Sequence, residues 1–209
     1  MHLSRLTLNR SRTAMLWSSN PYRVHQRLMM ACADDPRLLF RIEADEQKSQ
    51  VLVQTHQTPA WNSAFDEFDV LLREPEHKAF DPVLVNDGVY RFRLLANPTA
   101  KKTLEKNDGE KHKTRLGIFK EADQIEWLKR KLAESGAELI HWRVNPRGMV
   151  YSRKNPQKDN QTQVHYAVLF EGILKVIRSE ELLHALQTGI GTAKGYGFGL
   201  LSLGRVPSG

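Results

Sequence analysis

The spacing of apolar and polar residues along the first part of the chain predicts a strand, a helix, two paired strands, a second helix and a short strand. Their expected positions are Leu3–Leu8, Asn20–Ala33, Leu38–Ala44 with Val51–His56, within Trp61–Leu71, and Val83–Val85. The first helix has a well-defined start, because Asn20 suits the N-cap and Pro21 the first helical position, where no N–H is needed. One side of this helix should face the core and carries Val24, Leu28, Ala31 and Cys32.

The same order of elements returns in the second part of the chain. The pattern predicts strands at Val89–Ala96, Leu139–Val144, Val164–Val176 and Phe198–Leu203, and helices at Glu121–Ser135 and Ser179–Gln187. The first of these helices is the clearest in the chain, since Ile125, Leu128 and Leu132 share one face and Gly136 can end it.

Each part therefore reads β-α-β-β-α-β, which predicts an α+β protein of two tandem ferredoxin-like (RRM-like) domains. Each domain would be a four-stranded antiparallel sheet with two helices on one face. We expect the boundary near Asn86–Gly88, giving domains at 1–86 and 87–209. A single mixed α+β domain is the alternative.

A glycine-rich segment, Gly189–Gly199, lies just before the last expected strand. Its five glycines, Gly189, Gly191, Gly195, Gly197 and Gly199, leave the backbone free to adopt positive φ and to present N–H groups. With Lys194 among them, the loop suits a polyanion. A helix precedes the loop and a strand follows it, the reverse of a dinucleotide-binding fingerprint, and no GK[ST] occurs. Nucleotide cofactors are therefore not expected.

The composition of the chain points to a polyanionic partner and to a reducing compartment. Lys and Arg number 31 against 24 Asp and Glu, for a net charge of +7. Cys32 is the only cysteine, so no disulfide can form within the chain and the cytoplasm is the expected location. No apolar run approaches the roughly 20 residues that span a bilayer. The eight histidines show no zinc-ligand spacing, so no metal is expected.

Several separate motifs give the chain a family resemblance. The loop reads Gly-Ile-Gly, five residues, Gly-Phe-Gly, then Leu200–Leu203. Further matches are Asn20-Pro21-Tyr22 with His25, Phe92–Leu94 with Ala96–Pro98, Glu121-Ala122 with Trp127–Leu132, and Phe170–Gly172. The sequence resembles the CRISPR repeat-cleaving endoribonucleases of the CasE type, subunits of the type I-E Cascade complex. The resemblance covers nearly the whole chain and implies the same tandem ferredoxin-like architecture.

Tyr22 and His25 are the candidate catalytic residues. They are three positions apart on the first expected helix, so their side chains are neighbours, although such pairs are most often structural. The resemblance implies that His25 is the main catalytic residue and that Tyr22 assists it. RNA supplies its own 2′-OH nucleophile, and an imidazole with a pKa near 6.5 exchanges protons close to neutrality. Metal-free cleavage would leave a 5′-OH and a 2′,3′-cyclic phosphate.

One position departs from the family pattern. Some relatives carry a lysine five residues after the catalytic histidine, where this chain has Met30. Arg27 or Lys194 could stabilise the phosphorane instead, and the sequence assigns the general acid to neither.

Two basic stretches could bind RNA. Lys101–Arg115 is interpreted as a flexible loop, and its candidate contacts are Lys101, Lys102 and Arg115. Arg143–Lys158 joins two expected strands through the turn formers Pro146, Gly148 and Pro156. In the family a basic hairpin from this region grips the repeat stem, and the matching side chains here are Arg143, Arg147, Arg153, Lys154 and Lys158. Trp61, Trp127 and Trp142 are interpreted as core or interface residues rather than base-stacking platforms.

The sequence thus predicts a metal-independent endoribonuclease that needs no cofactor. The family resemblance implies that it binds the stem-loop of a CRISPR repeat, cuts the precursor RNA at the base of the stem, and keeps the hairpin within Cascade beside the other subunits. The main alternative is a non-catalytic RNA-binding module of two RRM-like domains. A DNA-binding or nucleotide-using enzyme is a second alternative.

Overall fold

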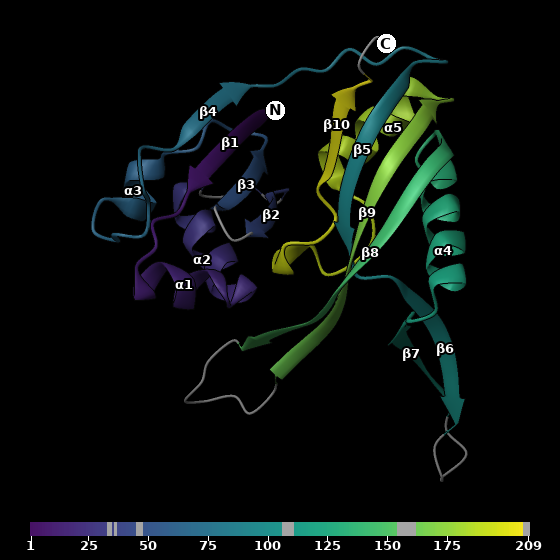
Figure 1. Cartoon of the computed structure of the whole chain (residues 1–209), viewed down its shortest axis with the longest axis horizontal. Helices are drawn as coiled ribbons and strands as arrows, with labels where there is room; N and C mark the ends of the chain where they lie inside the picture. The colour runs from purple at the N-terminus through teal and green to yellow at the C-terminus, as the bar shows by residue number, and fades with distance from the viewer. Residues whose placement is uncertain (33–34, 36, 45–47, 106–110, 154–161, 207–209) are drawn as a thin grey trace.

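Two four-stranded antiparallel sheets, each with helices on one face, make up the body of the protein (Figure 1). The computed structural model describes residues 1–32, 35, 37–44, 48–105, 111–153 and 162–206. The predicted α+β fold with antiparallel sheets is confirmed. No helix in these described ranges is both long and apolar enough to cross a bilayer.

The first sheet has the strand order β2-β3-β1-β4. In chain order its half of the molecule contains β1 (His2–Thr7), α1 (Arg12–Ser18), α2 (Pro21–Ala31), β2 (Leu39–Ala44), β3 (Ser49–Thr55), α3 (Trp61–Phe65) and β4 (Glu76–Ala79). The predicted core side of α2 is confirmed, since Val24, Leu28, Ala31 and Cys32 are all buried. They pack with sheet residues such as Leu6 and Val51 in one hydrophobic core.

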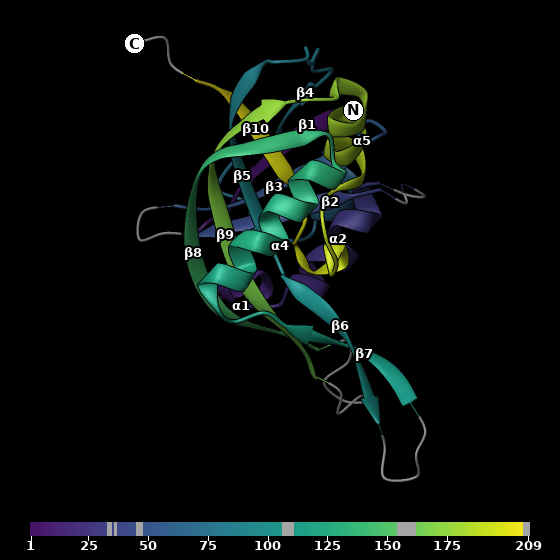
Figure 2. The same cartoon turned by 90° about the vertical axis from the view of Figure 1, so that its right-hand side faces the viewer.

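The second sheet repeats this arrangement with the order β10-β5-β9-β8. Its half contains β5 (Val89–Ala96), β6 (Thr99–Glu105), β7 (Lys111–Gly117), α4 (Glu121–Glu134), β8 (Ala137–Arg153), β9 (Thr162–Val176), α5 (Ser179–Thr188), the 3-10 turn η1 (Lys194–Tyr196) and β10 (Leu201–Arg205). Helices α4 and α5 cover one face of the sheet (Figure 2). Leu128, Leu186 and Phe170 belong to the hydrophobic core of this half.

Two expectations for the first half are corrected. The second helix, α3, is a single short turn of helix rather than most of Trp61–Leu71. The strand expected at Val83–Val85 is wrong, because these residues form no strand and Val83 is 84% exposed. The fourth strand of this sheet, which pairs with β1 on the side away from β3, is β4, whose residues Glu76–Ala79 are all exposed. An edge strand with no buried side chain carries no apolar alternation, so the pattern could not reveal it.

The flexible loop expected at Lys101–Arg115 is also wrong. Strands β6 and β7 form an antiparallel hairpin that pairs Lys101 with Arg115 and Lys102 with Thr114. The hairpin extends away from the body (Figures 1 and 2). Its described side chains include the exposed Lys101, Lys102 and Arg115. A ribbon that projects into water needs no apolar face, which is why its sequence resembles a charged loop.

The basic stretch that follows α4 differs from the expected strand and turn. Strand β8 continues from Ala137 through Pro146 and Gly148 to Arg153, so those two residues do not form the expected turn. They produce a register shift against β9 instead. Proline and glycine are compatible with this position because β8 is an edge strand and the irregularity resembles a bulge. The last strand, β10, begins at Leu201, and Phe198 belongs to the buried end of the glycine-rich loop.

The two halves are joined by a buried arginine. Arg41 on β2 is 2% exposed and donates to the carbonyl oxygen of Leu200 at 3.0 Å and to Oγ of Ser202 at 3.0 Å. Its charge is balanced by Glu43, with 2.9 Å between Nη2 and Oε1. Because both backbone and side-chain acceptors lie in the second half, Arg41 fixes the position of β2 relative to β10.

Candidate active site

Tyr22 and His25 on α2 both face the glycine-rich loop of the other half. A β-carbon placed on Gly195 would lie 3.8 Å from Nε2 of His25. The ring of Tyr22 lies 6.3 Å, centroid to centroid, from the ring of Tyr196. The structure therefore brings the two candidate catalytic side chains against the loop that the sequence singled out separately.

The environment of His25 favours a neutral imidazole. The ring is half-buried, and its centroid lies 6.0 Å from that of Phe40. Burial lowers the pKa of His25 below its ordinary value of 6.5, because the apolar surroundings disfavour the charged form. A neutral imidazole at neutral pH can accept a proton from a hydroxyl group held nearby.

The glycines of the loop are needed for packing as well as for backbone freedom. Gly189, Gly191, Gly197 and Gly199 all have positive φ. A β-carbon on Gly197 would approach Phe40 to 3.1 Å, and one on Gly191 would approach Trp127 to 3.3 Å. A side chain at these glycines would therefore meet protein rather than open space.

Of the two cations that the sequence offered to stabilise the phosphorane, Arg27 and Lys194, only Lys194 lies near Tyr22 and His25. Arg27 donates to the carbonyl oxygen of Ala64 at 3.0 Å, and its guanidinium lies 4.2 Å from the ring centroid of Phe68. Residues two positions apart on an α-helix point in directions roughly 200° apart around its axis, so Arg27 lies on the side of α2 opposite His25. Met30 lines the same hollow as Arg27. Lys194 adjoins Gly195 and is partly buried, and burial lowers the pKa of its ammonium.

Sequence reasoning missed two aromatic residues beside the pair. Tyr196 lies in η1, and its ring centroid is 4.5 Å from that of His165 on β9. Nδ2 of Asn97 donates to Nδ1 of His165 at 3.2 Å. Burial lowers the pKa of His165. The only available signal was a tyrosine flanked by two glycines, because nothing local in the sequence connects it with His165.

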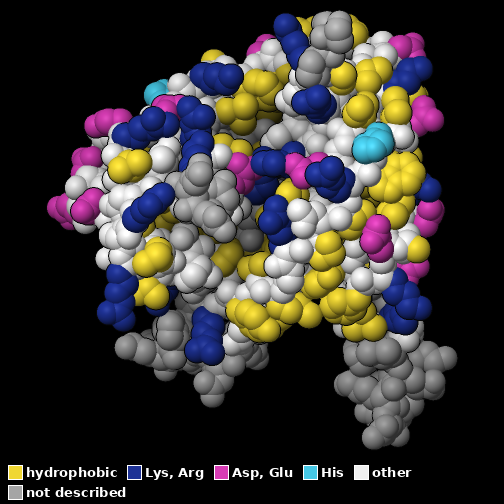
Figure 3. All heavy atoms as spheres, viewed as in Figure 1, with side chains coloured by type: hydrophobic (Ala, Val, Ile, Leu, Met, Phe, Trp, Pro, Cys, Tyr) yellow, Lys and Arg dark blue, Asp and Glu magenta, His cyan; other side chains and the backbone are white. Residues whose placement is uncertain are grey.

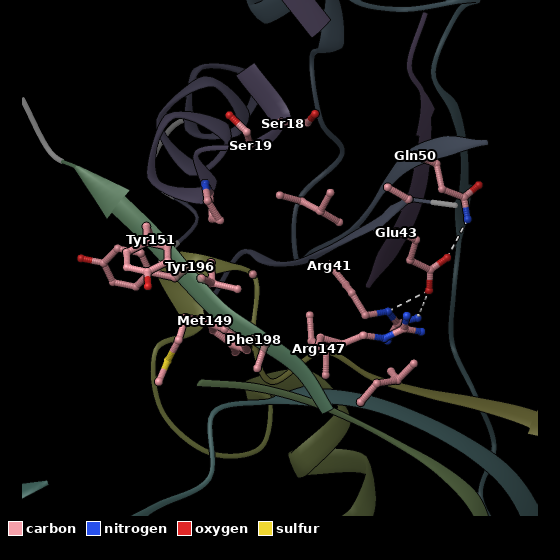
Figure 4. A pocket seen from close by; sticks show the side chains of 18 of the residues that line it. Ser18, Ser19, Arg41, Glu43, Gln50, Arg147, Met149, Tyr151, Tyr196 and Phe198 are labelled. Carbon is pink, nitrogen blue, oxygen red and sulfur yellow. Dashed lines mark hydrogen bonds and ion pairs between the residues drawn. The ribbon is translucent and has the colours of Figure 1, made fainter. Parts of the chain in front are cut away.

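A cleft of about 570 Å³ lies between the open faces of the two sheets, and Tyr196 and Tyr151 lie at one end of it (Figure 4). Arg147 also lines the cleft, together with the paired Arg41 and Glu43. In the space-filling view, Lys and Arg side chains gather in the hollow between the halves (Figure 3).

The predicted RNA-binding residues do not form one surface. Arg143 lies opposite Glu171 in the register of β8 and β9, at a second hollow on the open sheet face. Arg153, at the end of β8, accepts a hydrogen bond on its carbonyl oxygen from Nδ2 of Asn20 at 3.3 Å. Asn20 occupies the N-cap of α2 as predicted, but its side chain makes this bond rather than a capping bond. Lys154 and Lys158 lie outside the described residues.

The three tryptophans named in the sequence differ in their surroundings. Trp61 and Trp127 are buried in the cores of the first and second half, respectively, as expected. Trp142 is 38% exposed and is not a core residue, and Nζ of Lys129 lies 5.4 Å from its ring centroid. Among the described residues, no three His, Cys, Asp or Glu side chains gather as a metal site would require.

Comparison with known proteins places these features in a family context. A family model described as "CRISPR associated protein" matches residues 1–205. The chain is 33% identical to the CRISPR-associated endoribonuclease Cse3 of Thermus thermophilus, over 97% of this chain and 99% of that protein. It is 31% identical to the CRISPR system Cascade subunit CasE of Escherichia coli, over 97% and 98% of the two chains. A structure of the CRISPR endoribonuclease Cse3 bound to 19 nt RNA superposes with a TM-score of 0.82 at 32% identity, covering 98% of this chain and all of that one.

Proposed function

The chain belongs to the CRISPR-associated protein family that includes Cse3 and CasE, and we propose that it is an endoribonuclease that cuts precursor CRISPR RNA at the repeat stem-loop. After the cut it keeps the RNA hairpin and takes a place among the subunits of Cascade. The relatives support this activity through their names, and the structural neighbour was solved with RNA bound. Its location would be the cytoplasm.

The observation that carries the mechanism is the contact between α2 and the glycine-rich loop. His25 is half-buried beside Gly195, and burial lowers its pKa, which favours the neutral imidazole that could accept a proton from a ribose hydroxyl bound there. In the proposed reaction the 2′-oxygen attacks phosphorus while His25 accepts its proton. The bond from phosphorus to the 5′-oxygen breaks, and that oxygen takes up a proton. The products are a 2′,3′-cyclic phosphate and a 5′-OH, and no metal enters these steps.

Tyr22 is the proposed assistant of His25. One turn of α2 separates them on the same side of the helix, and both lie against η1. From there the Tyr22 hydroxyl can donate a hydrogen bond to a nonbridging phosphate oxygen. This contact would hold the phosphate in line for attack, which supplies much of the rate in such reactions.

We also propose the division into two domains and the residues that bind the RNA. Residues 1–86 and 87–209 would be two ferredoxin-like domains, and the repeated strand order supports this reading because the fourth strand of each half pairs with its first. RNA would be bound by the glycine-rich loop with Lys194 and by the basic side chains Arg143, Arg147, Arg153, Lys154, Lys158, Lys101, Lys102 and Arg115. The position of Arg153 supports a role for β8 in binding RNA, because the hydrogen bond from Asn20 holds that end of β8 at the start of α2.

A single-turnover cleavage assay with a repeat hairpin RNA in EDTA tests the function. We expect the parent chain to cut once at the base of the stem. His25→Ala should bind the hairpin normally and cut it at least about 100-fold more slowly, the loss expected for a general base. His184→Ala on α5, an exposed histidine remote from the cleft, is the matched control and should cut like the parent.

The outcomes separate the proposal from its alternatives. Binding without cleavage by the parent chain would favour a non-catalytic RNA-binding module. A hairpin with 2′-H at the scissile ribose should bind and remain intact. Cleavage of that RNA would contradict 2′-OH attack, and full activity of His25→Ala would remove His25 from the mechanism.

A further inference from the structure

Tyr196 occupies a position that folding alone does not require. Its ring is partly exposed and lines the cleft, and the 3-10 turn that carries it contains no buried residue. It belongs to neither of the two hydrophobic cores defined by the described residues. A partly exposed aromatic ring beside reactive groups is a common way to hold a nucleobase, since every base has a face that stacks.

The ring of His165 packs against the ring of Tyr196. The two ring centroids are 4.5 Å apart, and His165 is itself fixed by the hydrogen bond from Asn97 and by Phe198, whose centroid is 5.8 Å away. Because Asn97 donates to Nδ1, a neutral His165 carries its proton on Nε2. Within the described structure that nitrogen is buried without a hydrogen-bond partner. A buried nitrogen without a hydrogen-bond partner lowers stability, which indicates that His165 is kept for another role, such as holding Tyr196.

The ring also lies where the reacting nucleotide must be. Tyr196 directly follows Gly195, which faces His25, and the Tyr196 ring also neighbours the ring of Tyr22. A nucleotide whose 2′-OH reaches His25 therefore has its base within reach of Tyr196. In a regular A-form helix the 2′-oxygen is not in line with the bond to the 5′-oxygen. A base that leaves the helical stack and rests on a fixed ring can bring its ribose into line.

Resting on the endoribonuclease function proposed above, we propose that Tyr196 is the stacking platform for the base of the nucleotide that supplies the attacking 2′-OH. His165 is the positioning residue that holds the platform. The interaction concerns the aromatic face of Tyr196 and not its hydroxyl group. It acts on the chemical step more than on the affinity for the stem, which other residues bind.

The first test combines protein variants with an altered RNA. At saturating RNA, Tyr196→Ala and Tyr196→Leu should cut about 5- to 100-fold more slowly than the parent, the usual range for one lost base stack, whereas Tyr196→Phe should stay within about twofold. Affinity for the intact hairpin should change less than about threefold in all three. An RNA that lacks only the base at the cleavage nucleotide but keeps its 2′-OH should slow the parent by a similar factor.

On that abasic RNA, Tyr196→Ala should be no slower than the parent, because the stack is already absent. The platform role would be wrong if the rate losses from Tyr196→Ala and from the abasic RNA multiplied when combined. It would also be wrong if Tyr196→Ala cut intact RNA as fast as the parent. A parent chain that leaves intact hairpin uncut would instead overturn the endoribonuclease function itself.

His165 is tested by removal and by conservative replacement. His165→Ala should lower the single-turnover rate about tenfold at unchanged affinity, since the platform loses its support. His165→Phe keeps a flat ring behind Tyr196 and should recover most of the rate, with the pH profile of the parent. A loss in His165→Ala that His165→Phe does not recover, or no loss at all, would contradict the positioning role.

Discussion

His25 faces Gly195 across the boundary between the two halves. A β-carbon on Gly195 would be 3.8 Å from Nε2 of His25, which is an ordinary contact distance, and the backbone there does not have positive φ. We therefore expect Gly195→Ala to fold and cut within about threefold of the parent. Gly195→Leu should displace the imidazole and lower the single-turnover rate more than about tenfold at an unchanged melting temperature. Equal rates for both variants would show that the closeness of Gly195 to His25 has no part in cleavage.

Replacement of Gly197 by alanine, two residues further on, should destabilise the protein, unlike Gly195→Ala. Its φ is +85°, and an added β-carbon would meet Phe40 at 3.1 Å. Gly197→Ala should therefore lower the free energy of unfolding by about 1–3 kcal/mol, the usual cost of a left-handed non-glycine residue. Urea unfolding of the two alanine variants measures the contrast. A Gly197→Ala variant as stable as Gly195→Ala would mean that the loop relaxes away from Phe40.

These two glycines illustrate what the sequence could and could not predict. Glycine spacing indicated a loop with unusual backbone conformations, and four of its glycines do have positive φ. It could not distinguish a glycine that packs on Phe40 from one that faces His25, because both neighbours come from the other half. The contact of Tyr196 with Tyr22 escaped for the same reason, whereas its contact with His165 joins two elements of the same half, η1 and β9, that no local pattern connects.

Most predicted elements with one buried face were correct, but helix α1 was missed although its Ala14 and Trp17 are buried. Helix α2 was predicted from Pro21 and an apolar stripe that the core requires. Strand β4 is polar and exposed, and so is most of the described part of the β6–β7 hairpin, so these elements were missed or taken for a loop. The apolar Val83–Val85 suggested a strand, yet Val83 and Val85 are exposed in the segment that joins the halves.

The pH dependence of cleavage follows from the burial of His25. Burial lowers its pKa below the ordinary value of 6.5, so the neutral imidazole predominates at pH 7 and the protonated form predominates only at pH values below 6.5. A general base acts in its neutral form, so the rate should be level near neutrality and fall on the acid side of 6.5. Single-turnover rates between about pH 5 and about pH 9 measure this, with His165→Phe as a control for the second buried imidazole. A rate that rises as His25 becomes protonated would assign it the role of acid.

Arg41 should contribute more to stability than its neighbour Arg93. Arg41 is buried and joins Glu43 to acceptors in the second half, whereas the side chain of Arg93 is 45% exposed. Arg41→Met would leave Glu43 and the carbonyl oxygen of Leu200 short of a donor and should cost about 3 kcal/mol of unfolding free energy. Arg93→Met should cost less than about 1 kcal/mol, as expected of an exposed pair. Similar midpoints for the two variants in urea would show that the halves do not depend on Arg41.

The salt dependence of RNA binding tests the proposed grip of β8. Arg153 ends the strand next to Asn20 at the start of α2, and Arg147 lines the cleft, so a stem held by both would place its base near His25. Each phosphate contact that is lost should reduce the slope of log K against log salt by about 1. Arg153→Ala and Arg147→Ala should each show this reduction, with weaker binding at low salt. Arg130→Ala is the matched control, because Arg130 pairs with Glu134 on the exposed side of α4. A slope that falls equally in all three variants would reflect net charge alone, and an unchanged slope for Arg153→Ala would remove that residue from the RNA interface.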